Sequence, residues 1–193
     1  AFEGKNENIL TEDMFFQPMN VTDSTVTMRL QTTGNGYIDF AYRLLPESYM
    51  LNFDIRAVGL QNFFPAAQKT VNIDWSQLAR QQEKGYDFEQ RYTSLTYKPV
   101  DDGSDYLSEM KDDKESFEEP MQWIAFKNQF FSSVLIANQN FENVTLESVI
   151  QVNCNSINCA WHRNCGIDNV VAGDTSGVVH LLVPSYSINV QMA

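Results

Sequence analysis

The stretch that decides the fold is Thr25-Val-Thr-Met-Arg-Leu-Gln31, followed by Thr32-Thr-Gly-Asn-Gly36 and Tyr37-Ile-Asp-Phe-Ala-Tyr-Arg-Leu44. In both outer runs apolar residues alternate with polar ones, which is the period of two expected of a strand with one buried face. The Gly-Asn-Gly turn between them supplies residues that tolerate positive φ. The three segments together predict an antiparallel β-hairpin.

Further strands are predicted on both sides of this hairpin. Residues 49–58 alternate after the turn signal Pro46-Glu-Ser48, and the other runs rich in aromatic or branched residues are 71–75, 86–98, 121–127 and 129–137. One short helix is predicted at residues 76–84, since Ser76 can cap it and Gly85 can end it. The sequence therefore predicts an all-β, antiparallel sandwich or meander with one short helix near 76–84.

Composition and charge limit the partners. The chain has 193 residues, 43 % of them apolar, which suits one domain or two small ones. Its net charge is −12 and its pI is near 4.4, so nucleic acid or an anionic membrane surface would repel it. No apolar stretch approaches the roughly 20 residues of a membrane span, and the first ten residues lack a secretory leader pattern.

The last 43 residues differ in composition from the rest. Residues 151–193 hold one basic residue, two acids, all three cysteines, both histidines and none of the 13 phenylalanines. Residues 152–173 show no sustained period, although 178–183 could form a strand. The sequence thus predicts a truncated β-sandwich domain over 1–150 and an atypical tail over 151–193, holding either final strands or unrelated sequence.

The tail also holds the candidate metal ligands. Cys154, Cys159, His162 and Cys165 carry soft ligands that suit zinc, but their spacing lacks the paired C-x2-C knuckles of structural zinc sites. A local disulfide with one thiol left over, or three free thiols, is the favoured interpretation. The first 161 residues contain no histidine, which argues against Ser-His-Asp or Cys-His catalysis.

The acidic stretch 101–119 holds nine acids against two lysines, a local charge of −7. Its Asp101-Asp-Gly-Ser-Asp105 segment superficially suggests calcium but lacks the EF-hand register, so a solvated loop is favoured. The acids could also serve as paired carboxylates, although exposed groups keep ordinary pKa values. The sequence predicts no catalytic, cofactor-binding or metal-ligating residue, and hence no enzyme and no cofactor.

Aromatic residues in the strands leave a second function open. Core packing explains most of them, but a carbohydrate or peptide groove is the alternative use. The residues are Tyr37, Phe40, Tyr42, Phe53, Trp75, Tyr92, Trp123, Phe126, Phe130 and Phe131. A carbohydrate-binding β-sandwich module is therefore the alternative function.

Several strand patterns resemble one family of periplasmic domains. Met121-Gln-Trp-Ile-Ala-Phe-Lys-Asn-Gln-Phe-Phe-Ser-Ser-Val-Leu-Ile-Ala137 is similar to a signature in the large periplasmic domain of bacterial YidC membrane-protein insertases. Gly36-Tyr-Ile-Asp-Phe-Ala-Tyr-Arg-Leu44, Leu51-Asn-Phe-Asp-Ile-Arg-Ala-Val-Gly-Leu60 and Phe88-Glu-Gln-Arg-Tyr-Thr-Ser-Leu-Thr-Tyr-Lys98 resemble the Bacteroidetes version. The resemblance covers about residues 10–150, and the tail does not match it.

The resemblance implies a fold and a role. The fold is a β-supersandwich of the galactose-mutarotase type, and the role is a non-catalytic periplasmic domain that assists insertion of inner-membrane proteins. The implied partners are the Sec translocon accessory subunits SecDF and nascent membrane proteins, at the periplasmic face of the bacterial inner membrane. The full-length protein would be embedded in the membrane, and this chain would be its soluble part.

Overall fold

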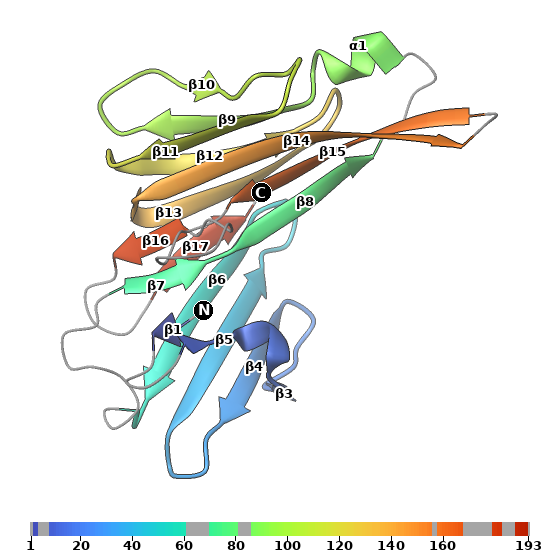
Figure 1. Ribbon diagram of the computed structural model, residues 1–193. Coiled ribbons are helices and arrows are strands. Elements are labelled where there is room, and N and C mark those ends of the chain that lie inside the picture. Colours follow the sequence, from blue (N-terminus) through green and yellow to red (C-terminus); the bar gives the residue numbers. More distant parts are fainter. Residues whose placement is uncertain are drawn as a thin grey trace. The chain divides into compact units, whose positions relative to one another are not determined.

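The computed structural model describes residues 2–3, 8–60, 70–80, 86–155, 158–167, 179–182 and 188–192 (Figure 1). The chain divides into two compact units. The first unit comprises Ala1–Asn72, Leu135–Gln139 and Leu181–Ala193, and the second comprises Ile73–Val134 and Asn140–His180. The chain thus leaves the first unit and returns to it twice.

The first unit is built on an antiparallel sheet in the order β17-β6-β5-β4-β3. Its strands are β3 (Gln17–Met19), β4 (Thr25–Gln31), β5 (Tyr37–Leu44), β6 (Leu51–Val58) and β17 (Ile188–Met192). Residues Leu135, Ile136 and Ala137 of β13 (Ser132–Glu142) pair with β17. Near the N-terminus lie the short pair β1 (Phe2–Glu3) and β2 (Asn8–Ile9) and the 3-10 helix η1 (Thr11–Asp13).

The hairpin predicted from the sequence is confirmed, with both strands bounded as expected. In the register Val26 lies opposite Tyr42 and Met28 opposite Phe40, so the apolar residues of both strands share one face. The ring of Phe40 stacks on that of Phe16, with 4.8 Å between the ring centroids. The ring of Phe53 in β6 lies 4.9 Å from Tyr42 and 5.4 Å from Phe40. Aromatic packing thus holds the apolar face of this sheet together.

The second unit contains two antiparallel sheets, in the orders β10-β9-β12-β13 and β11-β14-β15-β8. The strands of the first sheet are β9 (Ser94–Pro99), β10 (Asp105–Tyr106), β12 (Met121–Lys127) and β13. The strands of the second sheet are β8 (Trp75–Arg80), β11 (Asp113–Phe117), β14 (Val144–Asn155) and β15 (Asn158–Ile167). The one α-helix among the described residues, α1 (Tyr86–Gln90), precedes β9. Two short strands, β7 (Thr70–Ile73) and β16 (Val179–Leu182), pair with each other.

Ring contacts join the two sheets of the second unit. Tyr97 of β9 lies 4.7 Å from Phe117 of β11, and Phe126 of β12 lies 4.3 Å from Trp75 of β8. The buried apolar residues of this unit come from strands of both sheets and from the segment after β10. They include Leu95, Leu107, Met121, Ile124, Phe126, Phe141, Val144 and Leu146. The all-β, antiparallel sandwich predicted from the sequence is therefore confirmed.

The helix predicted at 76–84 is wrong where the structure describes it. Residues 75–80 form strand β8, which pairs with β15 so that Ser76 lies opposite Gly166. Residues 81–85 lie outside the described residues. Intrinsic helix propensity is a weak preference, and pairing with a neighbouring strand overrides it here.

The strand predicted over 86–98 is correct only in its second half. Residues 86–90 form α1, the chain turns at 91–93, and β9 begins at Ser94. A helix of five residues is too short to show a 3.6-residue period, so its pattern cannot be separated from that of a strand.

The tail contains strands that join the sheets. β14 continues past residue 151, β15 pairs with both β14 and β8, and β17 pairs with β6. The division of the chain near residue 150 and the origin of the tail stay predictions. Among the described residues, no helix is long and apolar enough to cross a membrane.

Alkaline pH is expected to destabilise the second unit through Tyr97. Burial, with the nearby Glu115 carboxylate, raises the pKa of this phenol to about 12, whereas an ordinary tyrosine titrates near pH ~10. The unfolded chain therefore loses this proton first, so the stabilisation is complete below about pH 10 and is lost as the pH rises toward about 12. Urea unfolding of wild type and Tyr97→Phe across this range should show the steeper loss in wild type. Equal slopes would contradict the assignment to Tyr97.

Candidate functional site

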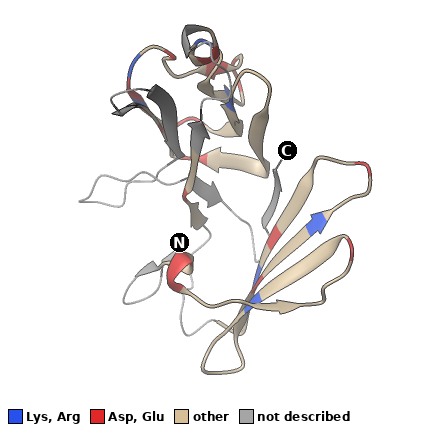
Figure 2. Ribbon diagram, turned by 90° about the vertical axis from the view of Figure 1, so that its right-hand side faces the viewer, with Lys and Arg blue, Asp and Glu red and all other residues tan. Residues whose placement is uncertain are grey.

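One face of the first unit's sheet is polar, and we call it the polar face. Directly opposed residues of β4, β5 and β6 share this face. Its members are Thr25, Thr27, Arg29, Gln31, Tyr37, Asp39, Ala41, Arg43, Asn52, Asp54, Arg56 and the apolar Val58. In Figure 2, blue and red positions both interrupt the strands of this sheet. Half of the six arginines of the chain thus lie on three neighbouring strands.

Arg29 is held in place by two neighbours on β5. Its Nε and Nη2 donate to the two carboxylate oxygens of Asp39 at 2.6 and 2.7 Å, a bidentate pair. Its guanidinium also lies 3.7 Å from the ring centroid of Tyr37. The hydrogen bond with Asp39 raises the pKa of Arg29. These contacts leave Arg29 little freedom to bind another molecule.

Arg43 and Arg56 are the exposed cations of the polar face. Arg56 lies opposite Asp39 in the register, and Arg43 lies opposite Asn52. Asp54 lies on β6 and feels the charges of both arginines. Burial raises the pKa of Asp54, while the positive charges of Arg43 and Arg56 lower it. The two exposed guanidinium groups can bind carboxylates or other anions from solution, and this arrangement supplies binding chemistry rather than a nucleophile.

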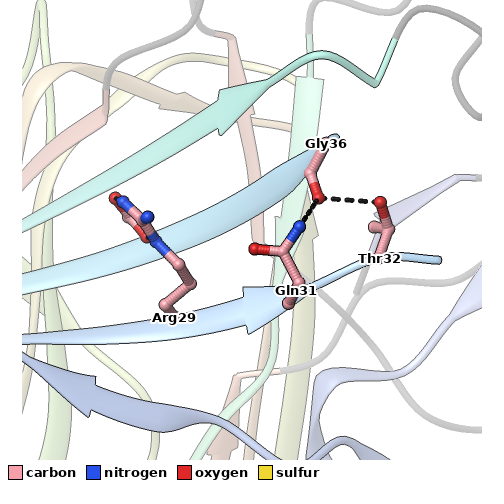
Figure 3. A network of polar contacts seen from close by, with 5 residues as sticks. Arg29, Gln31, Thr32 and Gly36 are labelled. Atoms are coloured by element: carbon pink, nitrogen blue, oxygen red, sulfur yellow. Dashed lines mark hydrogen bonds and ion pairs between the residues drawn. The ribbon is translucent and has the colours of Figure 1, made fainter. Parts of the chain in front are cut away.

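Polar contacts also lock the hairpin that carries this face (Figure 3). The carbonyl of Gly36 accepts hydrogen bonds from Gln31 Nε2 at 3.0 Å, from Thr32 Oγ1 at 2.7 Å and from the backbone N–H of Thr32 at 3.0 Å. Gln31 Nε2 also donates to the carbonyl of Gly34 at 3.2 Å. The turn is therefore fixed by side chains as well as by backbone, and it holds β4 and β5 in register.

A second surface is formed by aromatic residues that lie outside the core. Of the ten aromatic residues named from the sequence, most of which core packing explains, three are exposed: Tyr92 by 43 %, Phe130 by 59 % and Phe131 by 73 %. The last two follow Asn128, whose side-chain oxygen accepts hydrogen bonds from the backbone N–H groups of Phe130 at 3.0 Å and Phe131 at 2.8 Å. The available signal was this asparagine, because an Asn that starts a turn places the next residues at a hairpin tip.

Of the other strand aromatics, Phe126 is buried, and the remaining six are half-buried. The ring of Trp75 packs on Phe126, as a core residue does. Trp123 is half-buried, and its use as a sugar platform stays a prediction.

The candidate metal ligands of the tail lie in two paired strands. Cys154 and Cys159 are register partners in β14 and β15, and His162 and Cys165 follow in β15. The side chains of all four, and that of His180, lie outside the described residues, so disulfide, free thiols and metal stay open. Among the described residues, no group of three or more His, Cys, Asp or Glu is placed to hold a metal ion.

The acidic segment 101–105 uses its carboxylates locally. The side chain of Asp102 accepts from the N–H of Gly103 at 2.6 Å, and that of Asp105 accepts from the N–H of Tyr106 at 2.8 Å. Lys98 Nζ donates to the carbonyl of Asp102. These contacts are those of a capped, exposed loop.

Comparison with known proteins supplies the family. The family model of the YidC periplasmic domain matches residues 12–160. The chain is similar to proteins named membrane protein insertase YidC, with 70 % identity over 151 residues in Phocaeicola vulgatus, 49 % over 150 in Bacteroides fragilis and 43 % over 139 in Porphyromonas gingivalis.

The matches cover 78 %, 78 % and 72 % of this chain but only 24 %, 24 % and 22 % of those relatives. The chain therefore spans about a quarter of the length of the curated relatives it matches. The family match takes in the polar face and the exposed aromatic residues and ends at residue 160, within β15. On this basis the resemblance predicted from the strand motifs is confirmed, and the chain belongs to the YidC periplasmic domain family.

Proposed function

We propose that this chain is a non-catalytic docking domain of a membrane protein insertase, at the periplasmic face of the bacterial inner membrane. In this proposal it assists insertion by contacting the Sec accessory subunits SecDF and segments of nascent membrane proteins. The observation that carries the proposal is the family match over residues 12–160, together with 70 % identity to a protein named as an insertase.

The residues within the family match support a binding role over a catalytic one. Residues 12–160 contain no histidine, so the side chain that most often serves as a general base is missing from the matched part of the sequence. The polar face combines one ion pair across strands, Arg29 with Asp39, and two exposed arginines, Arg43 and Arg56. Exposed charges of this kind steer and orient a partner of opposite charge.

The polar face is the surface through which we expect a protein partner to dock. Arg43 and Arg56 are exposed on a sheet that is held rigid by the Arg29–Asp39 pair and the aromatic packing of its other face. Exposed arginines on a rigid surface suit a partner surface that presents carboxylates, because a guanidinium binds carboxylate in bidentate fashion.

A pull-down tests both the partner and the surface. The 193-residue chain would be immobilised and incubated with the purified periplasmic domains of SecDF, and binding would be measured by titration. We expect wild type to bind, and Arg43→Glu and Arg56→Glu each to weaken binding by about tenfold or more, because a favourable charge pair becomes a repulsive one. Lys111→Glu is the matched control, since it makes the same charge change at an exposed residue of the second unit.

The outcomes separate the two parts of the proposal. If wild type does not bind, the SecDF contact is wrong. If wild type binds and all three variants bind equally well, the partner stands and the polar face is the wrong surface.

A further inference from the structure

Four exposed aromatic residues of the second unit lie near one end of the sheet β10-β9-β12-β13, whereas a fifth, Tyr106, lies on the edge strand β10. Lys127, the last residue of β12, lies opposite Ser94, the first residue of β9. The turn after Lys127 carries Phe130 and Phe131, and the segment just before Ser94 carries Phe88 and Tyr92. We call these four residues the aromatic end; one of them, Phe88, belongs to α1, which Figure 1 labels.

The aromatic end presents its side chains outward. Phe88 is 56 % exposed, Phe130 59 % and Phe131 73 %. The rings of Phe88 and Tyr92 lie 5.0 Å apart. Asn128 fixes the turn, since its backbone N–H donates to the carbonyl of Phe131 at 2.9 Å while its side chain binds the N–H groups of both phenylalanines. Phe130 and Phe131 are neighbours on one ordered turn and together form an exposed apolar patch, and burying such a patch against another surface is favourable.

The opposite end of the same sheet is acidic. At this end Met121, the first residue of β12, lies opposite Pro99, the last residue of β9, and the N–H of Val100 donates to the carbonyl of Pro120. The segment that follows β9 and the segment that precedes β12 therefore both lie at this end. They carry the exposed acids Asp101, Asp102, Asp105, Glu118 and Glu119. The six residues of β9 separate the two ends by about 20 Å, which exceeds the Debye length of about 8 Å at physiological salt. The acidic charges therefore have little effect on what the aromatic end meets.

The charges around the aromatic end are mixed. Arg91 and Lys127 are exposed there, and Glu89 beside them is buried. The segment after β10 returns toward this end, since the N–H of Leu107 donates to the carbonyl of Leu95, and it brings Glu109, Lys111 and Asp112. Phenylalanines flanked by long cationic side chains suit the boundary between headgroups and acyl chains of a bilayer, where the rings are buried and the cations reach lipid phosphates.

We propose that the aromatic end docks on a zwitterionic phospholipid bilayer, with Phe130 and Phe131 inserted among the headgroups and the acidic end directed away. A protruding turn with two neighbouring phenylalanines fits a soft interface, and a net charge of −12 favours a zwitterionic surface over an anionic one. The proposal rests on the proposed function only in requiring a membrane close to the domain.

Vesicle flotation tests this docking. The 193-residue chain would be mixed with vesicles of phosphatidylcholine or of phosphatidylglycerol, and the bound fraction measured. We expect binding to phosphatidylcholine, weaker binding to phosphatidylglycerol at low salt, and a loss of about tenfold or more in the double variant Phe130→Ser with Phe131→Ser. Phe15→Ser is the matched control, because Phe15 is 95 % exposed and lies in the first unit; it should bind like wild type.

A second variant keeps the side chain apolar and reports its position directly. Phe131→Trp should be quenched by brominated phosphatidylcholine, whereas Phe15→Trp should not. Absence of wild-type binding, equal loss in the serine variants at both places, or binding that requires phosphatidylglycerol would each overturn the proposal. Because no Sec protein is present, failure here leaves the pull-down result untouched.

Discussion

Phe141→Ala is expected to lower the free energy of unfolding by about 3–5 kcal/mol, the usual cost of removing a buried phenyl ring. Phe141 is fully buried in the second unit, at 0 % exposure. Its removal takes apolar area out of the core and leaves a cavity that the rigid strands cannot fill by collapsing. Urea unfolding followed by circular dichroism would measure the change.

Phe131→Ala provides the control for this substitution. Phe131 precedes the same strand, β13, and is 73 % exposed, so the same chemical change should alter stability by no more than about 0.5 kcal/mol. Similar losses in the two variants would show that Phe141 does not belong to a packed core between the two sheets of the second unit.

Gly36→Ala is expected to destabilise the first unit by about 1–3 kcal/mol, because the site has no room for a methyl group. A Cβ at Gly36 would lie 2.5 Å from Leu60 Cδ2 and 2.7 Å from the carbonyl oxygen of Gly59. Leu60 is buried and the Gly59 oxygen is backbone, so relief requires movement of the chain. That movement would disturb the Gly36 carbonyl, which fixes the hairpin through Gln31 and Thr32.

The neighbouring Gly34 is the matched control, since a Cβ there meets nothing within 4 Å. Gly34→Ala should therefore leave the urea midpoint nearly unchanged. A Gly36→Ala variant as stable as Gly34→Ala would contradict this, because it would show that the backbone of Gly59 lies far enough from Gly36 in solution to admit a methyl group. Gly59→Ala adds an independent check, because φ at Gly59 is +69°, a conformation that costs an alanine about 1–2 kcal/mol.

Local pattern was enough for the central hairpin. The alternation in Thr25–Gln31 and Tyr37–Leu44 predicts both strands with their bounds and the face that each presents, because successive side chains of a strand point to opposite sides. Enrichment in aromatic and branched residues predicts the mostly buried strand Met121–Lys127 correctly. Local pattern fails at Trp75–Arg80, where it predicts a helix and the chain forms strand β8. The partner strand β15 lies about 90 residues further along the chain, so the residues of β8 themselves carry no sign of this pairing.

The candidate surfaces divide in the same way. That Arg29, Arg43 and Arg56 lie opposite the apolar face follows from alternation within each strand. That Arg29 pairs with Asp39, and that Phe130 and Phe131 stand outside the core, depends on register and on the end of β12, and neither can be read from periodicity.

The sequence by itself determined the all-β class, the apolar and polar faces of the central strands and the family, because these depend on the order of residues along single strands. Only the tertiary structure decided which strands are neighbours, which glycine has no room for a side chain and which aromatic residues gather at one end of a sheet. These features depend on contacts between residues that are far apart in the chain. Such contacts form only when the whole fold packs, so they leave no periodic signal in any one segment.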